Sequence, residues 1–380
     1  MTRTANTALS FSAEQAMLLD SAKDFCSVKS DSNAVRSLLK SETGYNPEVW
    51  SEMVALGWTG IAIPEQYGGF AMGLGSTVPV VESMGRSLLG TPFIATTLAA
   101  QAVLRGGSEA QRKKWLPAIV EGTVGSMALL DNEDWGAKLC GVSATESSDN
   151  NNSGILITGK KLLVADATVA DFFVVSINHC GNPALAIVEA SQLGADAISA
   201  NTLIDETKRA ATVDFSGVTI PADALLPNSE QALNDVRLIG ALLTAAEATG
   251  TSAATLDCIV SYLTSRIQFG RLIGSYQSLK HPTVDILLQM DSARSLIYHA
   301  ATVLDEGPVS EDAEIACRMA KAQATETLLF AGDRAVQFHG GMGFTYDCDA
   351  MLYIRRAQWA QHQYGDAQHH RLHLAKLLLD

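Results

Sequence analysis

Charge is scarce in this sequence, and positive charge is scarcer than negative charge. Asp, Glu, Lys and Arg make up only 18% of the 380 residues, and 41 acidic residues against 27 basic ones give a formal net charge of −14 at pH 7. A surface with this balance repels phosphate backbones and anionic lipid, so we expect neither nucleic acid nor a membrane surface as a partner. The hydrophobic share of 47% argues against disorder, and the length is sufficient for about two or three domains.

Paired cysteines and long apolar runs are also missing. The six cysteines stand singly, without a CxxC pair, at Cys26, Cys140, Cys180, Cys258, Cys317 and Cys348. This spacing favours reduced thiols over disulfides or a zinc site. The N-terminal residues contain no apolar signal core, and apolar stretches such as 87–104 are interrupted by turn residues. We therefore expect a soluble, cytoplasmic protein without a membrane span.

Three segments differ in their periodicity. Residues 1–123 carry helix-start signals, such as Pro47 after Asn46, and predict a helical domain. Residues 124–230 contain short β-branched and aromatic runs bounded by Gly, Asn and Asp, which predicts a β domain. Residues 231–380 return to a helical period in long segments joined by short loops. The expected class is α+β, with a C-terminal four-helix bundle whose second helix begins near Pro282.

Two stretches of the predicted bundle suit an anionic ligand. In SRIQFGRLIGSYQSLKH (265–281), two arginines flank a turn that glycines permit. In QFHGGMGF (337–344), three glycines after a helix expose backbone N–H groups and allow close approach of a ligand. The competing interpretations are a charged loop between helices for the first stretch and a glycine-rich helix cap for the second.

Together these stretches, with IPEQYGG (63–69) and ESMGRS (82–87), resemble the acyl-CoA dehydrogenase family over nearly the whole chain. The resemblance implies a helical domain, a β domain and a four-helix bundle, with FAD as the cofactor and acyl-CoA thioesters as substrates that are oxidised to 2,3-enoyl-CoA. It also implies residues that contact the FAD of a neighbouring subunit, namely Arg266, Phe269, Gln277, Gln337, Gly340 and Gly341.

The catalytic base of this family is not where the resemblance predicts it. The usual glutamate position falls on Tyr364, whose phenol has an ordinary pKa near ~10 and is a poor base at neutral pH. The alternative position, on the long bundle helix, falls near Gly240. Glu247 lies seven residues further, which is about two helical turns, and is our candidate base. A buried or interface ion pair is the competing interpretation of Glu247, and Asp366 is a second unorthodox base.

The β domain also departs from the family. The family's T-E-P-G-x-G-S-D segment corresponds here to LLDNEDWGAKLCG (129–141), and its W-I-T/S segment corresponds to LLVAD (162–166). The loss of these two segments suggests a heteromer. The ending HQYGDAQHHR (362–371) and the segment KKLLVADATVADFFVV (160–175) resemble one subunit of the heteromeric enzymes of this family, which act on bulky CoA thioesters such as steroid side chains. The expected partners are an unlike acyl-CoA dehydrogenase subunit and, as acceptor, an electron-transferring flavoprotein. The alternatives are a homo-oligomer (dimer or tetramer) with its own base, and a non-catalytic scaffold.

The histidines near the C-terminus raise the question of a metal site. His362, Asp366 and His370 are spaced by four and would share one face of a continuous helix. Gly365 is expected to interrupt that helix, and the resembled family uses no metal. We therefore expect no metal site.

Overall fold

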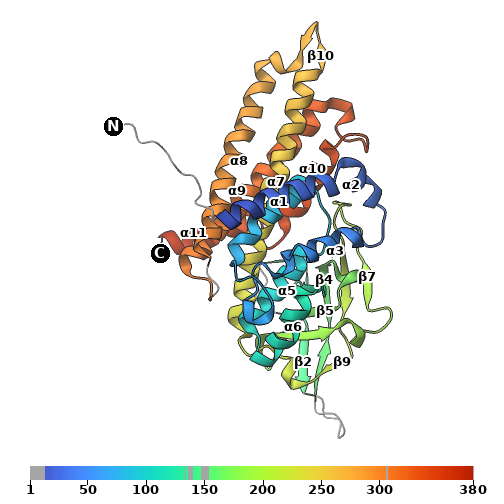
Figure 1. The fold of residues 1–380 in the computed structure, drawn as a ribbon, viewed down its shortest axis with the longest axis vertical. Helices are drawn as coiled ribbons and strands as arrows, with labels where there is room; N and C mark the ends of the chain where they lie inside the picture. Colours follow the sequence, from blue (N-terminus) through green and yellow to red (C-terminus); the bar gives the residue numbers. More distant parts are fainter. Residues whose placement is uncertain (1–12, 133, 136–139, 147–153, 305–306, 380) are drawn as a thin grey trace.

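The predicted order of a helical domain, a β domain and a helical bundle is confirmed (Figure 1). The computed structural model describes residues 13–132, 134–135, 140–146, 154–304 and 307–379. The N-terminal helices are α1 (Ala13–Lys29), α2 (Ser32–Leu38), α3 (Pro47–Ala55), α4 (Thr77–Arg86), α5 (Phe93–Gly106) and α6 (Glu109–Val120). Asn46 caps α3, and Ser108 with Gln111 forms a capping box on α6, as these residue types favour.

The β domain contains two sheets. Within the described residues its strands are β1 (Gly125–Ala128), β2 (Ser143–Glu146), β3 (Ile155–Thr158), β4 (Lys160–Ala165), β5 (Phe172–His179), β6 (Asn182–Glu189), β7 (Ile198–Ala200), β8 (Ala210–Asp214) and β9 (Val218–Ile220). The larger sheet has the order β1-β5-β2-β3-β9, with β6 paired to β5, and the smaller one has the order β4-β8-β7. Strand β5 pairs in parallel with β1 and antiparallel with β6. Its first six residues are buried, as expected of a central strand.

The C-terminal bundle is built on three long helices. They are α7 (Ser229–Ser265), α8 (Gln277–Val303) and α9 (Glu311–His339), followed by α10 (Ala350–His362) and α11 (Ala367–Leu379). A short hairpin of β10 (Ile267–Gln268) and β11 (Arg271–Leu272) joins α7 to α8 at the tip of the bundle, at the top of Figure 1. The prediction that the second helix begins near Pro282 was wrong. Helix α8 begins five residues earlier and accommodates Pro282 in its second turn.

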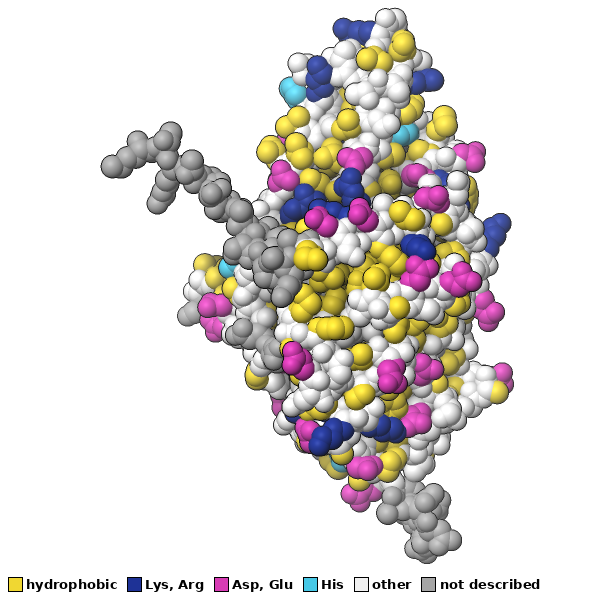
Figure 2. Space-filling view, viewed as in Figure 1, with side chains coloured by type: hydrophobic (Ala, Val, Ile, Leu, Met, Phe, Trp, Pro, Cys, Tyr) yellow, Lys and Arg dark blue, Asp and Glu magenta, His cyan; other side chains and the backbone are white. Residues whose placement is uncertain are grey.

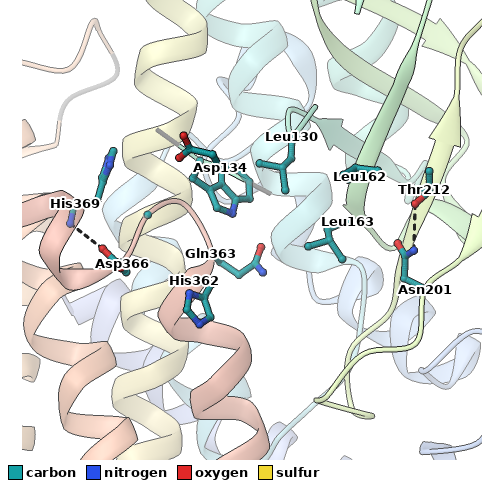
Figure 3. A pocket seen from close by; sticks show the side chains of 12 residues that line it. Leu130, Asp134, Leu162, Leu163, Asn201, Thr212, His362, Gln363, Asp366 and His369 are labelled. Carbon is teal, nitrogen blue, oxygen red and sulfur yellow. Dashed lines mark hydrogen bonds between the residues drawn. The ribbon is translucent and has the colours of Figure 1, made fainter. Parts of the chain in front are cut away.

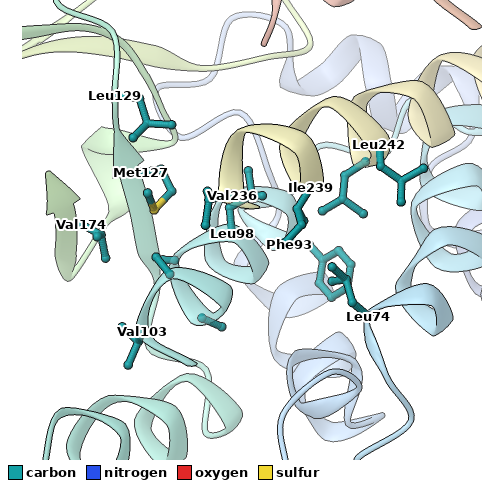
Figure 4. Packing of buried hydrophobic residues seen from close by; sticks show 14 of the residues in the cluster. Leu74, Phe93, Leu98, Val103, Met127, Leu129, Val174, Val236, Ile239 and Leu242 are labelled. Atoms are coloured by element: carbon teal, nitrogen blue, oxygen red, sulfur yellow. The ribbon is translucent and has the colours of Figure 1, made fainter. Parts of the chain in front are cut away.

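Helix α7 of the bundle packs against both the N-terminal helices and the β domain. Every residue from Leu238 to Thr255 is buried, so this helix has no solvent face along its middle. Its apolar side chains pack against α5 and β1 in the main core, where the labelled Val236 and Ile239 lie near Leu98 and Met127 (Figure 4). Helix α4 approaches α7 so closely that a Cβ atom on Gly250 would lie 1.8 Å from the carbonyl oxygen of Glu82. Glycine is therefore required at that crossing.

The face of the molecule that Figure 2 shows carries charges of both signs. Figure 2 shows acidic and basic side chains interspersed over the visible face, with apolar side chains between them. None of the helices that the structure describes is both long and apolar enough to cross a membrane.

Candidate functional site

Four of the six predicted cofactor-binding residues meet in one groove at the tip of the bundle. This bundle-tip groove has a volume of about 600 Å³ and lies between the end of α7, the β10–β11 hairpin, the start of α8 and the end of α9. Arg266, Phe269, Gly340 and Gly341 line it. Gln277 is the first residue of α8 and Gln337 lies in the last turn of α9. Neither glutamine is among the described residues that line the groove.

Local sequence explains the shape of the groove. Phe269 and Gly270 form the two-residue loop of the hairpin, and their φ angles of 54° and 77° are those of a type I′ turn. This turn leaves the Phe269 ring 92% exposed at the rim. On the other side, Tyr262 and His339 stack with their ring centroids 4.1 Å apart. The groove therefore offers flat apolar surfaces next to a cation, Arg266.

The groove suits an anionic ligand that approaches the backbone closely. A Cβ atom added to Gly340 or Gly341 would meet no heavy atom within 4 Å, so the backbone there faces open space. The described residues that line the groove include Arg266 and no carboxylate. Open space over two glycines beside a guanidinium allows close approach of a diphosphate.

A second pocket, which we call the interdomain pocket, lies between the β domain and the α10–α11 turn (Figure 3). Its volume is about 500 Å³. The two segments in which the β domain departs from the family, 129–141 and 162–166, both contribute to this pocket. The turn that follows Tyr364, the usual position of the base, contributes as well. Its walls include Leu130, Trp135, Leu162, Leu163, Gly365 and Asp366. Within the first of these segments, residues 133 and 136–139 lie outside the described part of the chain.

The electrostatics of the interdomain pocket are opposite to those of the groove. Among the described residues that line it, Asp134 and Asp366 are carboxylates and none is lysine or arginine. The buried Oδ1 of Asn201 has no hydrogen-bond partner, while its Nδ2 donates to Thr212 Oγ1 at 3.1 Å. A lining that contributes carboxylates and neither lysine nor arginine disfavours a diphosphate. The anionic part of FAD therefore fits the bundle-tip groove better than this pocket.

Both expected positions of the catalytic base meet beside the interdomain pocket. A Cβ atom on Gly240 would lie 2.5 Å from Cε1 of Tyr364, so the phenol ring covers this glycine. Tyr364 has a φ angle of 58°, and its ring packs on Trp135 with the centroids 4.8 Å apart. Burial, together with the charge of Asp166, raises the pKa of the Tyr364 phenol above its usual value. The phenol is therefore neutral at physiological pH and cannot serve as a resting base.

The contact between these two positions can be tested by a double-mutant cycle. We expect Gly240→Ala to lower the free energy of unfolding by about 1–3 kcal/mol, because the new methyl group would clash with the ring of Tyr364. In a Tyr364→Ala background the same change should be neutral or stabilising, since alanine favours a helix interior over glycine by about 1 kcal/mol. Urea denaturation of the four proteins measures both values. An equal effect of Gly240→Ala in the two backgrounds would contradict the packing described here.

Asp366 caps a helix, and the neighbouring histidines lie on two different helices. The Asp366 carboxylate accepts a hydrogen bond from the backbone N–H of His369 at 2.8 Å, which caps the start of α11. Gly365, with a φ of 96°, interrupts the helix as expected. His362 consequently ends α10, whereas His370 is buried on α11. No group of three or more metal-ligating side chains with the spacing of a metal site occurs within the described residues.

Glu247, the candidate base, lies in a buried ion cluster. Its side chain is 3% exposed and its Oε1 lies 3.0 Å from Nη1 of Arg356 and within hydrogen-bond distance of Nζ of Lys208. Burial favours a raised pKa for Glu247, but the charges of Arg356 and Lys208 outweigh it and the pKa is lowered. Arg356 also donates from Nε to Asp205 at 2.5 Å. These contacts favour the ion-pair interpretation over a base that accepts a substrate proton.

The sequence analysis missed two groups in this region. Arg356, which is fully buried, connects α10 to α7 and to the segment before β8. Asp166 follows β4 with a φ of 53°, and burial raises its pKa to about 7, although the charge of Lys208 opposes this shift. The sequence offered one signal for each residue: Arg356 stands in the apolar run of α10, and Asp166 ends the segment LLVAD. Neither signal identifies a partner that is distant in the sequence.

Comparisons with known proteins agree with this architecture. The model of the acyl-CoA dehydrogenase N-terminal domain matches residues 12–123, and that of the C-terminal domain matches residues 232–379. The acyl-CoA dehydrogenase IpdE2 of Mycolicibacterium smegmatis is 27% identical over 347 residues, which are 91% of this chain and 93% of IpdE2.

Two solved structures extend the match across the β domain. The Tcur3481–Tcur3483 steroid ACAD, solved as a variant, superposes with a TM-score of 0.83 at 25% identity and covers 96% of this chain and 97% of its own. The ChsE4–ChsE5 complex of Mycobacterium tuberculosis superposes with a TM-score of 0.86 at 22% identity, over 98% and 99% of the two chains. With both family domains matched and the fold shared over nearly its whole length, the chain belongs to the FAD-dependent acyl-CoA dehydrogenase family.

Proposed function

We propose that this chain is one subunit of a heteromeric acyl-CoA dehydrogenase. It lends its bundle-tip groove to an FAD held with an unlike chain of the same family, and the pair desaturates an acyl-CoA thioester between Cα and Cβ. The observation that carries the proposal is the Tyr364 ring packed on Gly240, which fills both expected positions of a base with groups that accept no proton at neutral pH. The groove, by contrast, is lined by four of the six residues expected to bind the cofactor.

The residues of this chain would act on binding and orientation. Arg266 would pair with the diphosphate, and Gly340 and Gly341 would let it approach the backbone. Phe269, at the exposed rim, would be covered by the unlike chain. When bound, FAD supplies the acceptor for the hydride that leaves Cβ of the thioester. The base that removes the α-proton would come from the unlike chain, since Tyr364 is neutral and Glu247 is already paired with two cations.

The substrate and the electron acceptor are further parts of the proposal. We infer a bulky acyl chain, such as a steroid side chain, from the likeness to a steroid ACAD. We infer an electron-transferring flavoprotein as the acceptor from membership of the family. There are two alternatives to the heteromeric dehydrogenase. The first is a homo-oligomeric dehydrogenase with Glu247 as base, and the second is a non-catalytic scaffold subunit.

The visible spectrum of the purified protein tests the proposal. We expect little flavin absorbance from this chain expressed alone, and about one FAD per pair after co-expression with an unlike acyl-CoA dehydrogenase chain encoded nearby. Anaerobic addition of a steroid-side-chain CoA thioester should then bleach the flavin of the pair.

Each other result selects an alternative. A chain that is yellow when purified alone, and is bleached by substrate, would contradict the heteromer and make the rate of bleaching in Glu247→Gln the deciding measurement. A pair that forms and contains no flavin would favour the scaffold. A flavin that bleaches with a straight-chain thioester and not with the steroid one would retain the heteromer and overturn the inferred substrate class.

A further inference from the structure

A buried lysine lies in contact with a half-buried cysteine in the β domain, away from the bundle-tip groove. Lys161, on β4, is 0% exposed, and its Nζ donates to Asp131 Oδ1 and to Ser176 Oγ, both at 2.7 Å. The same Nζ lies 3.3 Å from Sγ of Cys140. The proposed desaturation uses none of these groups, and burying an ammonium is costly unless its contacts compensate.

The environment of Cys140 differs from that of the other cysteines. Burial raises the pKa of the Cys26 and Cys317 thiols to about 12, which makes them poor nucleophiles. Cys140 is only partly buried, and among the described residues it is the cysteine whose sulfur contacts a lysine. Its S–H donates to the carbonyl oxygen of Ser176 at 3.1 Å, which fixes the sulfur beside the ammonium.

A second cation, Arg237, is near enough to Cys140 to interact with it electrostatically. Burial lowers the pKa of Arg237, on α7, while its electrostatic interactions with Cys140 and Asp131 oppose that shift. The Nε of Arg237 is buried and has no hydrogen-bond partner. The lysine nitrogen thus lies directly beside the sulfur, and the partial exposure of Cys140 admits a small oxidant.

We propose that Cys140 and Lys161 form a reversible covalent cross-link when the protein meets a peroxide. In the first step, hydrogen peroxide oxidises the Cys140 thiol to a sulfenic acid and is itself reduced to water. In the second step, the Lys161 nitrogen attacks the sulfur, an S–N bond forms, and the S–OH bond breaks to release water. The ammonium proton that must leave passes to the Asp131 carboxylate, which is 2.7 Å away. The sulfur loses two electrons in total, and one peroxide accepts them.

The cross-link would act on the interdomain pocket. Asp131 and Cys140 bracket the segment that contains Trp135, which packs on Tyr364. Lys161 stands at an irregularity in the pairing of β4 with β8, directly before Leu162 and Leu163 in the pocket wall. A bond between Cys140 and Lys161 would tie one wall of the pocket to the other. It would thereby hold Trp135 against Tyr364.

Peptide mapping of the full-length protein tests this proposal. We would treat the purified chain with hydrogen peroxide, block free thiols, digest with trypsin without reductant, and sequence the peptides by tandem mass spectrometry. We expect a peptide containing Cys140 joined to one containing Lys161, with the summed mass of the two less two hydrogens. Trypsin should fail to cut after Lys161 in the linked species, and dithiothreitol should restore the separate peptides.

Three variants give matched controls. Cys140→Ser and Lys161→Arg should abolish the linked peptide, the second while keeping a positive charge beside Asp131. Cys180→Ser should leave it unchanged, since Cys180 is exposed and lies next to His179 instead. A linked peptide that is heavier by one oxygen would indicate an S–O–N link between the same two residues. Its formation would consume a second molecule of peroxide. The proposal would be overturned if peroxide-treated wild-type protein contained dimedone-labelled or sulfinic Cys140 and trypsin still cut normally after Lys161.

Discussion

Replacing Arg356 with methionine is expected to lower the free energy of unfolding by about 3–5 kcal/mol at neutral pH. Arg356 is 0% exposed and pairs with Asp205 through Nε and with Glu247 through Nη1. Methionine fits the space of the arginine stem but leaves two buried carboxylates without their main cation. A loss of this size is a large share of the stability of an ordinary domain. Urea denaturation followed by circular dichroism measures it.

The loss should depend on pH in a definite direction. Burial favours raised pKa values for Asp205 and Glu247, but the charge of Arg356 outweighs burial and both pKa values are lowered. In the wild type the cluster therefore stabilises the fold above the ordinary carboxyl pKa of about 4, and this contribution is lost as the pH falls through the lower folded-state values. In Arg356→Met, burial instead favours the protonated carboxyls. The difference between the two proteins should therefore narrow below about pH 5.

A surface arginine on the adjoining helix gives the matched control. Arg371, on α11, pairs with Glu326 but is 56% exposed, so Arg371→Met should cost no more than about 1 kcal/mol. Equal losses in the two variants, or a loss in Arg356→Met that is independent of pH, would show that the cluster does not hold α10 to α7. Either result would also return Glu247 to consideration as a free carboxylate and hence as a base.

The fold followed from the sequence because its signals are local. Asn46 with Pro47, and Ser108 with Gln111, mark helix starts through contacts within one turn, and the structure forms these caps. The β segment was recognisable because strand periodicity differs from helix periodicity within a few residues. The wrong start of α8 had the same origin, since Pro282 was placed at the first position of a helix, where proline is most common, and not in its second turn.

The site was only partly predictable, because its decisive contacts join distant segments. The two motifs predicted cofactor-binding residues, and four of these, Arg266, Phe269, Gly340 and Gly341, line one groove. They come together because each motif follows the end of a long helix at the bundle tip. The role of Glu247 was left open, because its partners Arg356 and Lys208 are far from it in the sequence.

Two other pairs of the site were equally hidden. Gly240 and Tyr364 were both recognised as substitutions of a base, yet only the fold brings them into contact. The pairing of Cys140 with Lys161 depends on the order of strands, which residue spacing does not fix.

The second large effect is expected at the bundle-tip groove. Gly341→Val should abolish FAD binding by the co-expressed pair without unfolding this chain. An added Cβ at Gly341 meets no heavy atom within 4 Å, and the backbone there does not require a positive φ, so valine can be accommodated in the isolated subunit. The same side chain would project into the open groove beside Arg266, where it would occupy the space proposed for the diphosphate. Flavin absorbance per pair, with the unfolding midpoint of the isolated chain, measures both effects.

Two other glycines separate blocked binding from misfolding. Gly194 lies in the β domain with open space around its added Cβ, so Gly194→Val should keep both flavin and stability. At Gly343, next to the groove, an added Cβ would lie 2.4 Å from the carbonyl oxygen of Val336, so Gly343→Val should destabilise the chain itself. Only Gly341→Val is expected to lose flavin at unchanged stability. Full flavin occupancy in that variant would show that this chain does not lend the groove to a cofactor, because no diphosphate could share the space with the new side chain.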